Sequence, residues 1–127
     1  MIISTTEAPA AIGPYSQAIV HNGMVYCSGQ ISLTPEGEGP KGETAAEQTE
    51  LIFNNIEAVL KAAGSSLDRI VKTTIFLIDM DDFTAVNEVY GKRLGEHRPA
   101  RSTVAVTSLP KAAIVEIEIL ASTVDLS

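Results

Sequence analysis

The segment RIVKTTIFLIDMDDFTAVNEVY, residues 69–90, decides the fold, because it predicts a strand that leads directly into a helix. Residues 69–79 are β-branched and apolar on both faces, which is typical of a central strand covered on at least one side. Asp79 and Asp82 supply side chains that begin helices, and Gly95 supplies the conformation that ends them. The predicted buried stripe of this helix consists of Phe83, Val86, Tyr90 and Leu94.

The N-terminal half predicts three more strands and a first helix. The opening residues IIST read as a strand, and residues 16–31 read as two strands joined by the turn Asn22–Gly23, a strong hairpin signal. After a loop rich in glycine and proline, Thr44 and Glu47 form a capping box. They begin a helix of about five turns, which ends where Gly64 supplies a left-handed residue.

Two last strands, near residues 101–107 and 113–123, complete the order β-β-β-α-β-α-β-β. This order predicts an α+β fold in which one mixed sheet carries both helices on a single face. A chain of 127 residues fits a single domain, residues 1–127. The other sheet face then lacks a cover, although its side chains, Ile75 and Leu77 or their alternates, are expected to be apolar. Such a face is usually buried against a partner, so the sequence predicts an oligomer.

The composition narrows the classes of function. Hydrophobic residues make up 45% of the chain and charged residues 20%, as in ordinary globular proteins. The net charge of −7 argues against a nucleic-acid partner. No segment approaches the ~18 consecutive apolar residues of a membrane helix, and the first residues do not resemble a signal peptide. Because Cys27 is the single cysteine, no internal disulfide can form, and we expect a cytoplasmic protein without a membrane partner.

Most catalytic chemistries lack a signal in this chain. His21 and His97 have no carboxylate or thiol at ligand spacing, so no metal site is predicted. Cys27 and Ser28 adjoin Gly29, but no histidine is placed to activate either of them, and Cys27 fits better as a small core residue. A glycine-rich phosphate loop is also missing, and no cofactor is expected.

An arginine and a glutamate on the last two strands are the remaining candidates. In a simple antiparallel hairpin turning around residues 108–109, Arg101 would lie across from Glu116, because both are equally far from the turn. One interpretation is a cross-strand ion pair worth roughly 0.2–1 kcal/mol. The other is a site, in which the planar arginine grips a carboxylate and the glutamate handles a proton or a water. The two residues alone leave both interpretations open.

Five segments, spread over nearly the whole chain, form a recognisable pattern. They are APAAIGPYSQA, CSGQI, DRIVKTTIFLIDMDDFTAVNEVY, PARSTV and LPKAAIVEIEILA. In this order and spacing they resemble the reactive intermediate deaminase family, the RidA or YjgF-like proteins. The resemblance implies a chorismate mutase-like fold and a homotrimer whose three sheets form a central barrel, with a cleft at each subunit interface.

The resemblance also implies an activity that needs no cofactor. Members of the family hydrolyse reactive enamines and imines, such as 2-aminoacrylate, 2-iminopropanoate and 2-iminobutanoate, to 2-keto acids and ammonia. By resemblance, Arg101 binds the substrate carboxylate, and Glu116 or a backbone carbonyl orients the attacking water. The other implied substrate-binding residues are Tyr15, Ser28, Gly29, Asn87 and Thr103. Tyr15, Ser28 and Asn87 also have structural interpretations, as a loop anchor, a strand terminus and a helix-side hydrogen bond.

The sequence departs from the family pattern at two places. Thr103 stands where many members carry a reactive cysteine, so thiol-dependent behaviour is not carried over. The segment GKRLGEHR, residues 91–98, is shorter than in several relatives and bears on the cleft wall and on substrate size.

Two other functions are considered. A non-catalytic trimer that binds small 2-keto acids would use the same Arg101. A ribonuclease or translation inhibitor is disfavoured by the net charge of −7.

Overall fold

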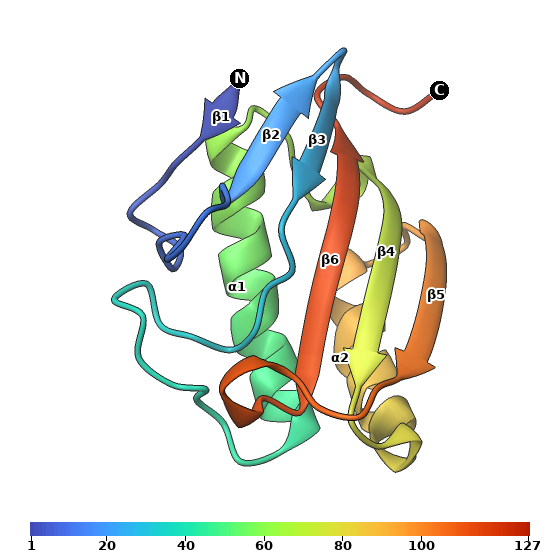
Figure 1. The fold of residues 1–127 in the computed structure, drawn as a ribbon. Coiled ribbons are helices and arrows are strands. Elements are labelled where there is room, and N and C mark those ends of the chain that lie inside the picture. The colour runs from blue at the N-terminus through green and yellow to red at the C-terminus, as the bar shows by residue number, and fades with distance from the viewer.

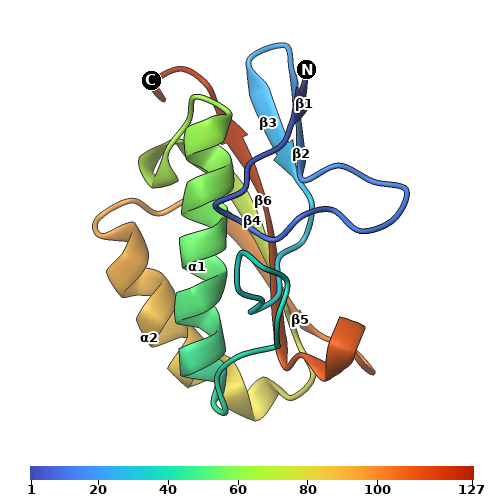
Figure 2. The same cartoon turned by 90° about the vertical axis from the view of Figure 1, so that its left-hand side faces the viewer.

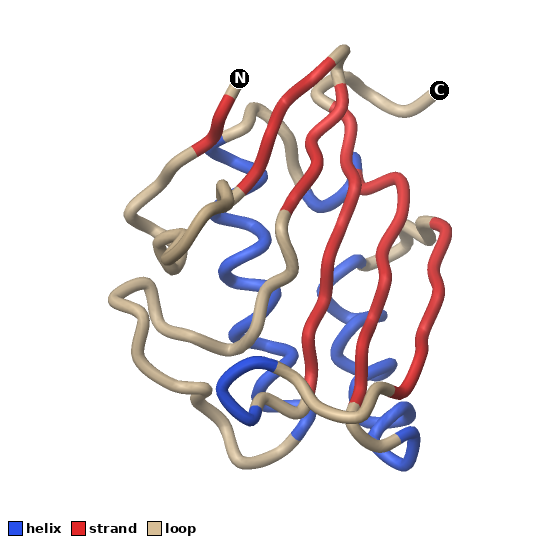
Figure 3. The backbone as a smooth tube through the Cα atoms, in the orientation of Figure 1, coloured by secondary structure: helices blue, strands red, loops and turns tan.

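The computed structural model describes residues 1–127 as one six-stranded sheet with two α-helices. The strands are β1 (Ile2–Ile3), β2 (Ala18–His21), β3 (Met24–Cys27), β4 (Ile70–Leu77), β5 (Ala100–Ala105) and β6 (Val115–Ser122). Their order in the sheet is β1-β2-β3-β6-β4-β5, and β4 with β5 is the parallel pair (Figures 1 and 3). The predicted α+β class, the mixed sheet and the element order are confirmed.

The first helix, α1 (Ala45–Ala62), begins and ends at the predicted signals. The Thr44 side chain accepts a hydrogen bond from the Glu47 backbone amide, and the Glu47 side chain accepts one from the Thr44 amide. This capping box satisfies donors that the first helical turn leaves unpaired. At the other end, Gly64 has φ 78°, a left-handed conformation in which glycine avoids the steric cost of a side chain.

The second helix, α2 (Phe83–Leu94), lies on the same face of the sheet as α1, as predicted (Figure 2). The Asp79 carboxylate accepts a hydrogen bond from the Asp81 amide, and so begins a short 3-10 turn, Met80–Asp82, that precedes the helix. The helix ends at Gly95, where φ is 63°. No helix of the structure is long and apolar enough to cross a membrane.

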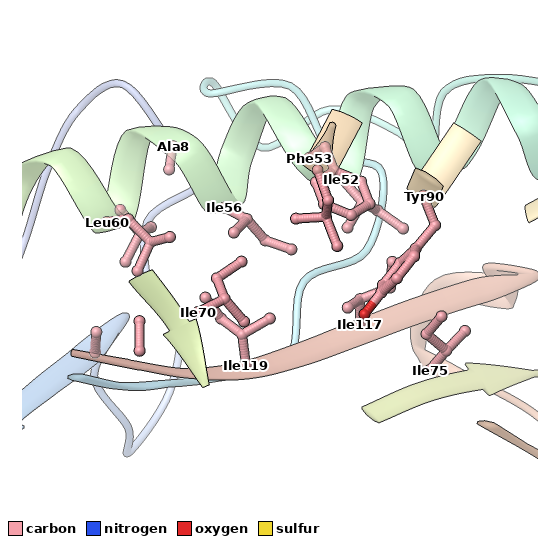
Figure 4. Packing of buried hydrophobic residues seen from close by; sticks show 14 of the residues in the cluster. Ala8, Ile52, Phe53, Ile56, Leu60, Ile70, Ile75, Tyr90, Ile117 and Ile119 are labelled. Atoms are coloured by element: carbon pink, nitrogen blue, oxygen red, sulfur yellow. The ribbon is translucent and has the colours of Figure 1, made fainter. Parts of the chain in front are cut away.

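The core lies between the two helices and the sheet (Figure 4). The α1 side chains that are fully buried there include Ile52, Phe53, Ile56 and Leu60. They pack in one cluster with alternate residues of the inner strands, among them Ile75, Leu77, Ile117 and Ile119. Ile75 and Leu77 therefore point toward the helices, not toward the uncovered face.

The uncovered sheet face carries the alternate residues and is less apolar than expected. On β4 it presents Lys72, Thr74 and Phe76, of which Lys72 is exposed and the other two are half-buried. These residues pair in register with Leu120, Glu118 and Glu116 of β6. Exposed apolar side chains on the same face are Ile19 at 37%, Tyr26 at 47% and Val104 at 44%. The face is thus a mixture of apolar and charged groups without a cover from its own chain.

The predicted hairpin between the last two strands is wrong. Strand β4 lies between β5 and β6, pairing with β5 in parallel and with β6 in antiparallel fashion. Arg101 is therefore the register partner of Thr73, and Glu116 is the register partner of Phe76. The physical reason is that β4, α2 and β5 form a strand–helix–strand crossover, which places two strands side by side in parallel.

Candidate active site

The first of two candidate cavities has a volume of about 480 Å³ and is lined by the N-terminal loop, the segment after β3 and the start of β6. We call it the Glu116 cavity. It brings together Tyr15, Ser28, Gly29 and Glu116, four of the residues named from the sequence. Ser28 and Gly29 follow β3 directly, and Glu116 is the second residue of β6. Residues far apart in the sequence therefore face one space.

Gln17, which the sequence analysis did not single out, holds the loop that forms this cavity. Its buried side-chain amide donates to the carbonyls of Pro9 at 2.8 Å and Thr5 at 3.1 Å, and its Oε1 accepts from the Thr5 amide at 2.7 Å. The Ser28 hydroxyl donates to the Ser16 carbonyl at 2.6 Å. Ser28 thus ties the N-terminal loop to the end of β3 through its hydroxyl.

Glu116 approaches the backbone at Gly29 so closely that no side chain fits between them. A Cβ atom at position 29 would lie 2.7 Å from Glu116 Oε2 and 3.0 Å from its Cδ. Burial raises the pKa of the Glu116 carboxyl above its ordinary value of 4.5, and the charge of Glu118 raises it further. A carboxyl group with a raised pKa at the wall of a cavity is suited to transferring a proton or orienting a water.

The loop before β6 adds a strained segment to the same cavity. Lys111 lines the cavity, and it has a φ of 55°, followed by Ala112 with a φ of 59°. Left-handed backbone at two successive residues other than glycine costs of order 1–3 kcal/mol each and is found preferentially near functional sites. The sequence offered no signal for this feature, because neither residue is one that prefers such a conformation.

The second candidate cavity, of about 410 Å³, is lined by residues of α2 and of the chain entering β5. We call it the Arg101 cavity. Arg101 Nη1 donates to Asn87 Oδ1 at 2.7 Å. The guanidinium carbon lies 4.9 Å from the ring centre of Tyr90 and 5.4 Å from that of Phe83. Because a guanidinium has five N–H donors and this one makes a single hydrogen bond, most of its fork is free to bind a carboxylate.

Thr103 lines neither cavity. It lies two residues after Arg101 on the same face of β5, in register with the buried Ile75. Its hydroxyl oxygen is buried and makes no hydrogen bond. A buried polar atom without a partner costs about 1–3 kcal/mol, so this hydroxyl has a hydrogen bond to offer to any group that reaches it.

The two cavities open on opposite faces of the sheet within one chain. Arg101 packs on α2, on the helix-covered face, whereas Glu116 is in register with Phe76 of the uncovered face. The ion pairs of the structure join Arg69 to Asp125, Lys92 to Glu88, and Arg93 to both Glu50 and Glu57. The cross-strand ion pair between Arg101 and Glu116 is therefore excluded, and the two residues line different cavities of the chain.

Other reactive groups of the chain show no organised site. Burial raises the pKa of the Cys27 thiol to about 12, so the thiol stays protonated and behaves as a core residue. His97 Nε2 donates a hydrogen bond of 2.7 Å to the Ile70 carbonyl. No group of three or more histidine, cysteine, aspartate or glutamate side chains is close enough to hold a metal ion.

Comparison with known proteins gives consistent matches over nearly the whole chain. Residues 5–123 match the family model described as Endoribonuclease L-PSP. The chain is 46% identical over 121 residues to Reactive Intermediate Deaminase A, chloroplastic, of Arabidopsis thaliana, covering 95% of this chain and 65% of that protein. It is 43% identical over 120 residues to the 2-iminobutanoate/2-iminopropanoate deaminase of Mus musculus, covering 94% and 89%. Among solved structures, E. coli TdcF with bound serine has a TM-score of 0.89 and 43% identity, covering 96% of this chain and 98% of that one.

Proposed function

Because this chain belongs to the reactive intermediate deaminase or YjgF-like family, we propose that it hydrolyses small 2-imino acids and their enamine tautomers to 2-keto acids and ammonia. The substrates are 2-aminoacrylate, its tautomer 2-iminopropanoate, and 2-iminobutanoate. The observation that carries the proposal is the exposed guanidinium of Arg101, which makes one side-chain hydrogen bond and rests on two aromatic rings. It offers a carboxylate a fixed, planar pair of donors.

The proposed site is shared between two subunits of a homotrimer. Arg101 and Glu116 lie in separate cavities, and each cavity holds only part of the predicted machinery. A closed ring of three copies, in which each interface joins different surfaces of its two chains, can bring the Arg101 cavity of one subunit to the Glu116 cavity of the next. The uncovered sheet face, with its exposed Ile19, Tyr26 and Val104, then supplies contact area inside the trimer.

The proposed mechanism uses only groups of the protein and water. Arg101 holds the substrate carboxylate, and Glu116 or a nearby backbone carbonyl orients a water toward the imine carbon. The water oxygen bonds to that carbon while the imine nitrogen gains a proton, which gives a carbinolamine. Loss of the hydroxyl proton and protonation of the nitrogen then break the C–N bond, so ammonia leaves and the 2-keto acid remains. Tyr15 and Gly29 form the wall beside Glu116, whereas the buried Thr103 hydroxyl lies outside both cavities and takes no step.

The direct test of the proposal is a coupled assay. A pyridoxal-phosphate dehydratase acting on serine or threonine generates the imino acid in place, and the release of keto acid is followed with and without this protein. We expect faster release with the protein present. A rate equal to that of the uncatalysed reaction, together with calorimetric binding of the 2-keto acid, would favour the non-catalytic binder.

A ribonuclease is a second candidate, because the matching family model is described as Endoribonuclease L-PSP. A net charge of −7 disfavours an RNA partner, because phosphate neutralisation requires clustered lysine and arginine.

A cytoplasmic location remains a prediction, and one relative named above is chloroplastic.

Adding a methyl group at position 29 tests the role of Glu116 without replacing Glu116 itself. In Gly29→Ala the added Cβ would meet the flexible end of the Glu116 side chain at 2.7 Å, so the carboxylate must move. We expect kcat to fall about 10- to 100-fold, because small displacements of a reacting group carry such costs. The melting temperature should change little, because a flexible side chain gives way without disturbing the fold. An unchanged kcat would show that the observed position of Glu116 is not the working one.

A further inference from the structure

Tyr90 lies at the centre of a set of contacts that join three elements of the fold. It is 5% exposed, and its hydroxyl shares a hydrogen bond of 2.8 Å with the buried Thr73 hydroxyl of β4. Its ring meets the Phe53 ring of α1 edge-on, with centres 5.8 Å apart and planes at 74°. Figure 4 shows the side chain reaching from α2 toward the sheet. The position and orientation of the Tyr90 ring are thus fixed on two sides.

We infer that Tyr90 and Phe83 act as positioning residues, forming an aromatic platform that holds the Arg101 guanidinium ready for a carboxylate. The inference rests on the proposed function only in assigning carboxylate binding to Arg101. The guanidinium carbon lies within 5.4 Å of both ring centres, the range of a cation–π contact. The Asn87 amide oxygen then accepts from Nη1 and fixes the rotation of the fork.

The platform matters because Arg101 is exposed and lies on an edge strand. A free arginine side chain loses rotamer entropy when it binds a ligand. Contacts made before binding reduce that loss, so a held arginine binds a carboxylate more tightly than a free one. Asn87, named from the sequence as a cleft residue, contributes here through Arg101.

The register of the sheet places the hydrogen-bond partner of the Tyr90 hydroxyl directly beside Arg101. Thr73 is the β4 residue paired with Arg101 of β5, and its side chain points to the same helix-covered face. The residue beside Arg101 in the sheet therefore holds the ring on which Arg101 lies. Each of the two buried hydroxyl groups, on Thr73 and Tyr90, is the hydrogen-bond partner of the other. The loss of either group would leave the other unsatisfied.

Steady-state kinetics of three variants test the platform. For Tyr90→Leu and Phe83→Leu we expect the KM for 2-iminobutanoate and the Kd for 2-oxobutanoate to rise about 2- to 30-fold, the range of a lost cation–π contact. The kcat should remain near that of the wild type, because the platform acts on binding of the carboxylate. Tyr90→Phe keeps the ring and should restore most of the affinity.

Val86→Ala is the matched control, because Val86 is buried on the same helix one turn from Tyr90 and makes no cation–π contact or hydrogen bond to Arg101. It should lower the melting temperature without raising KM. The inference is overturned if Val86→Ala raises KM as much as the platform variants do. Should Tyr90→Leu fail to fold, Phe83→Leu decides the matter, since Phe83 is only partly buried.

A measurement that needs no substrate separates this inference from the proposed function. The NMR order parameter of Arg101 Nε in the free protein should be high in the wild type and should fall in Phe83→Leu and Tyr90→Leu. Unchanged order would overturn the platform, whatever the activity. If the wild type neither turns over 2-iminobutanoate nor binds 2-oxobutanoate, the proposed function fails, and the order parameter alone decides whether the platform holds Arg101.

Discussion

Replacing Arg101 by alanine is expected to reduce turnover of 2-iminobutanoate to the background rate while the protein stays folded and assembled. A charge-assisted, two-point contact to a carboxylate is worth about 1.5–3 kcal/mol, and its loss also removes the orientation of the imine carbon toward water. Because Arg101 is exposed and a cation–π contact at an exposed site is worth about 0.5–1 kcal/mol, the loss of stability should be within about 1 kcal/mol. Single-turnover kinetics and thermal unfolding check the two parts of this expectation.

Arg101→Lys is the informative companion of this variant. Lysine keeps the positive charge but lacks the planar fork, so it should recover part of the binding and little of the orientation. Activity near that of the wild type in Arg101→Ala would mean that Arg101 merely packs on Phe83 and Tyr90. The carboxylate would then have to be bound elsewhere, and the assignment of the site would be wrong.

Replacing Glu116 by glutamine is expected to lower kcat by roughly 10²- to 10⁴-fold, the usual effect of losing a positioned acid or base. Glutamine keeps the shape of the side chain beside Gly29 but cannot accept a proton from water. The Kd for 2-oxobutanoate, measured by calorimetry, should change much less, since Arg101 holds the carboxylate. If kcat is undiminished, water is activated by a backbone carbonyl, and Glu116 has no part in the chemistry.

Because the pKa of Glu116 is raised, the wild type and Glu116→Gln should differ in the pH dependence of both activity and stability. The ionised carboxylate acts as the base, so wild-type activity should fall as pH drops through the raised pKa, and this limb should be missing in Glu116→Gln. For stability, the folded state binds the Glu116 proton more tightly than the unfolded state, so stability decreases as pH rises from 4.5 through the folded pKa. Glu116→Gln should therefore melt higher than the wild type at neutral pH and equally below pH 4.5.

Glu118→Gln is the matched control, because Glu118 lies two residues away on the same face of β6 and is exposed. The charge of Glu118 contributes to the raised pKa of Glu116. Its removal should leave the maximal kcat unchanged and shift the acid limb of the pH profile to lower pH. A loss of kcat as large as that of Glu116→Gln would show that the two carboxylates act as a pair.

Local signals in the sequence sufficed for the boundaries of most elements. The capping box of Thr44 and Glu47, the turn at Asn22–Gly23 and the glycine at position 64 each satisfy backbone groups within a few residues, so they are legible without the tertiary structure. The position of β4 between β5 and β6, in contrast, depends on contacts between residues far apart in the sequence. The strand–helix–strand pattern of residues 70–105 did carry a signal for it, since such a crossover places its strands in parallel.

The candidate site shows the same division between local and distant information. The resemblance to a family supplied Tyr15, Gly29 and Glu116, which the structure brings to one cavity. Alternation along the strands could not reveal that Arg101 faces α2, because the face of a side chain depends on the register with β4. Gln17 and Tyr90 were missed as parts of the site, since the role of a buried polar group depends on partners distant in sequence.

Mixed trimers of two inactive variants test the central claim, a site shared between subunits, most directly. Arg101→Ala and Glu116→Gln chains with different tags are expressed together, and the hybrids are purified through both tags and confirmed as trimers by sedimentation. Each variant alone should be inactive. In each purified hybrid, one interface of the ring combines an intact Arg101 from one variant with an intact Glu116 from the other, so we expect activity of about a third of the wild type. Mixed trimers as inactive as either parent, or a wild-type protein that sediments as a monomer at micromolar concentration, would contradict the shared site.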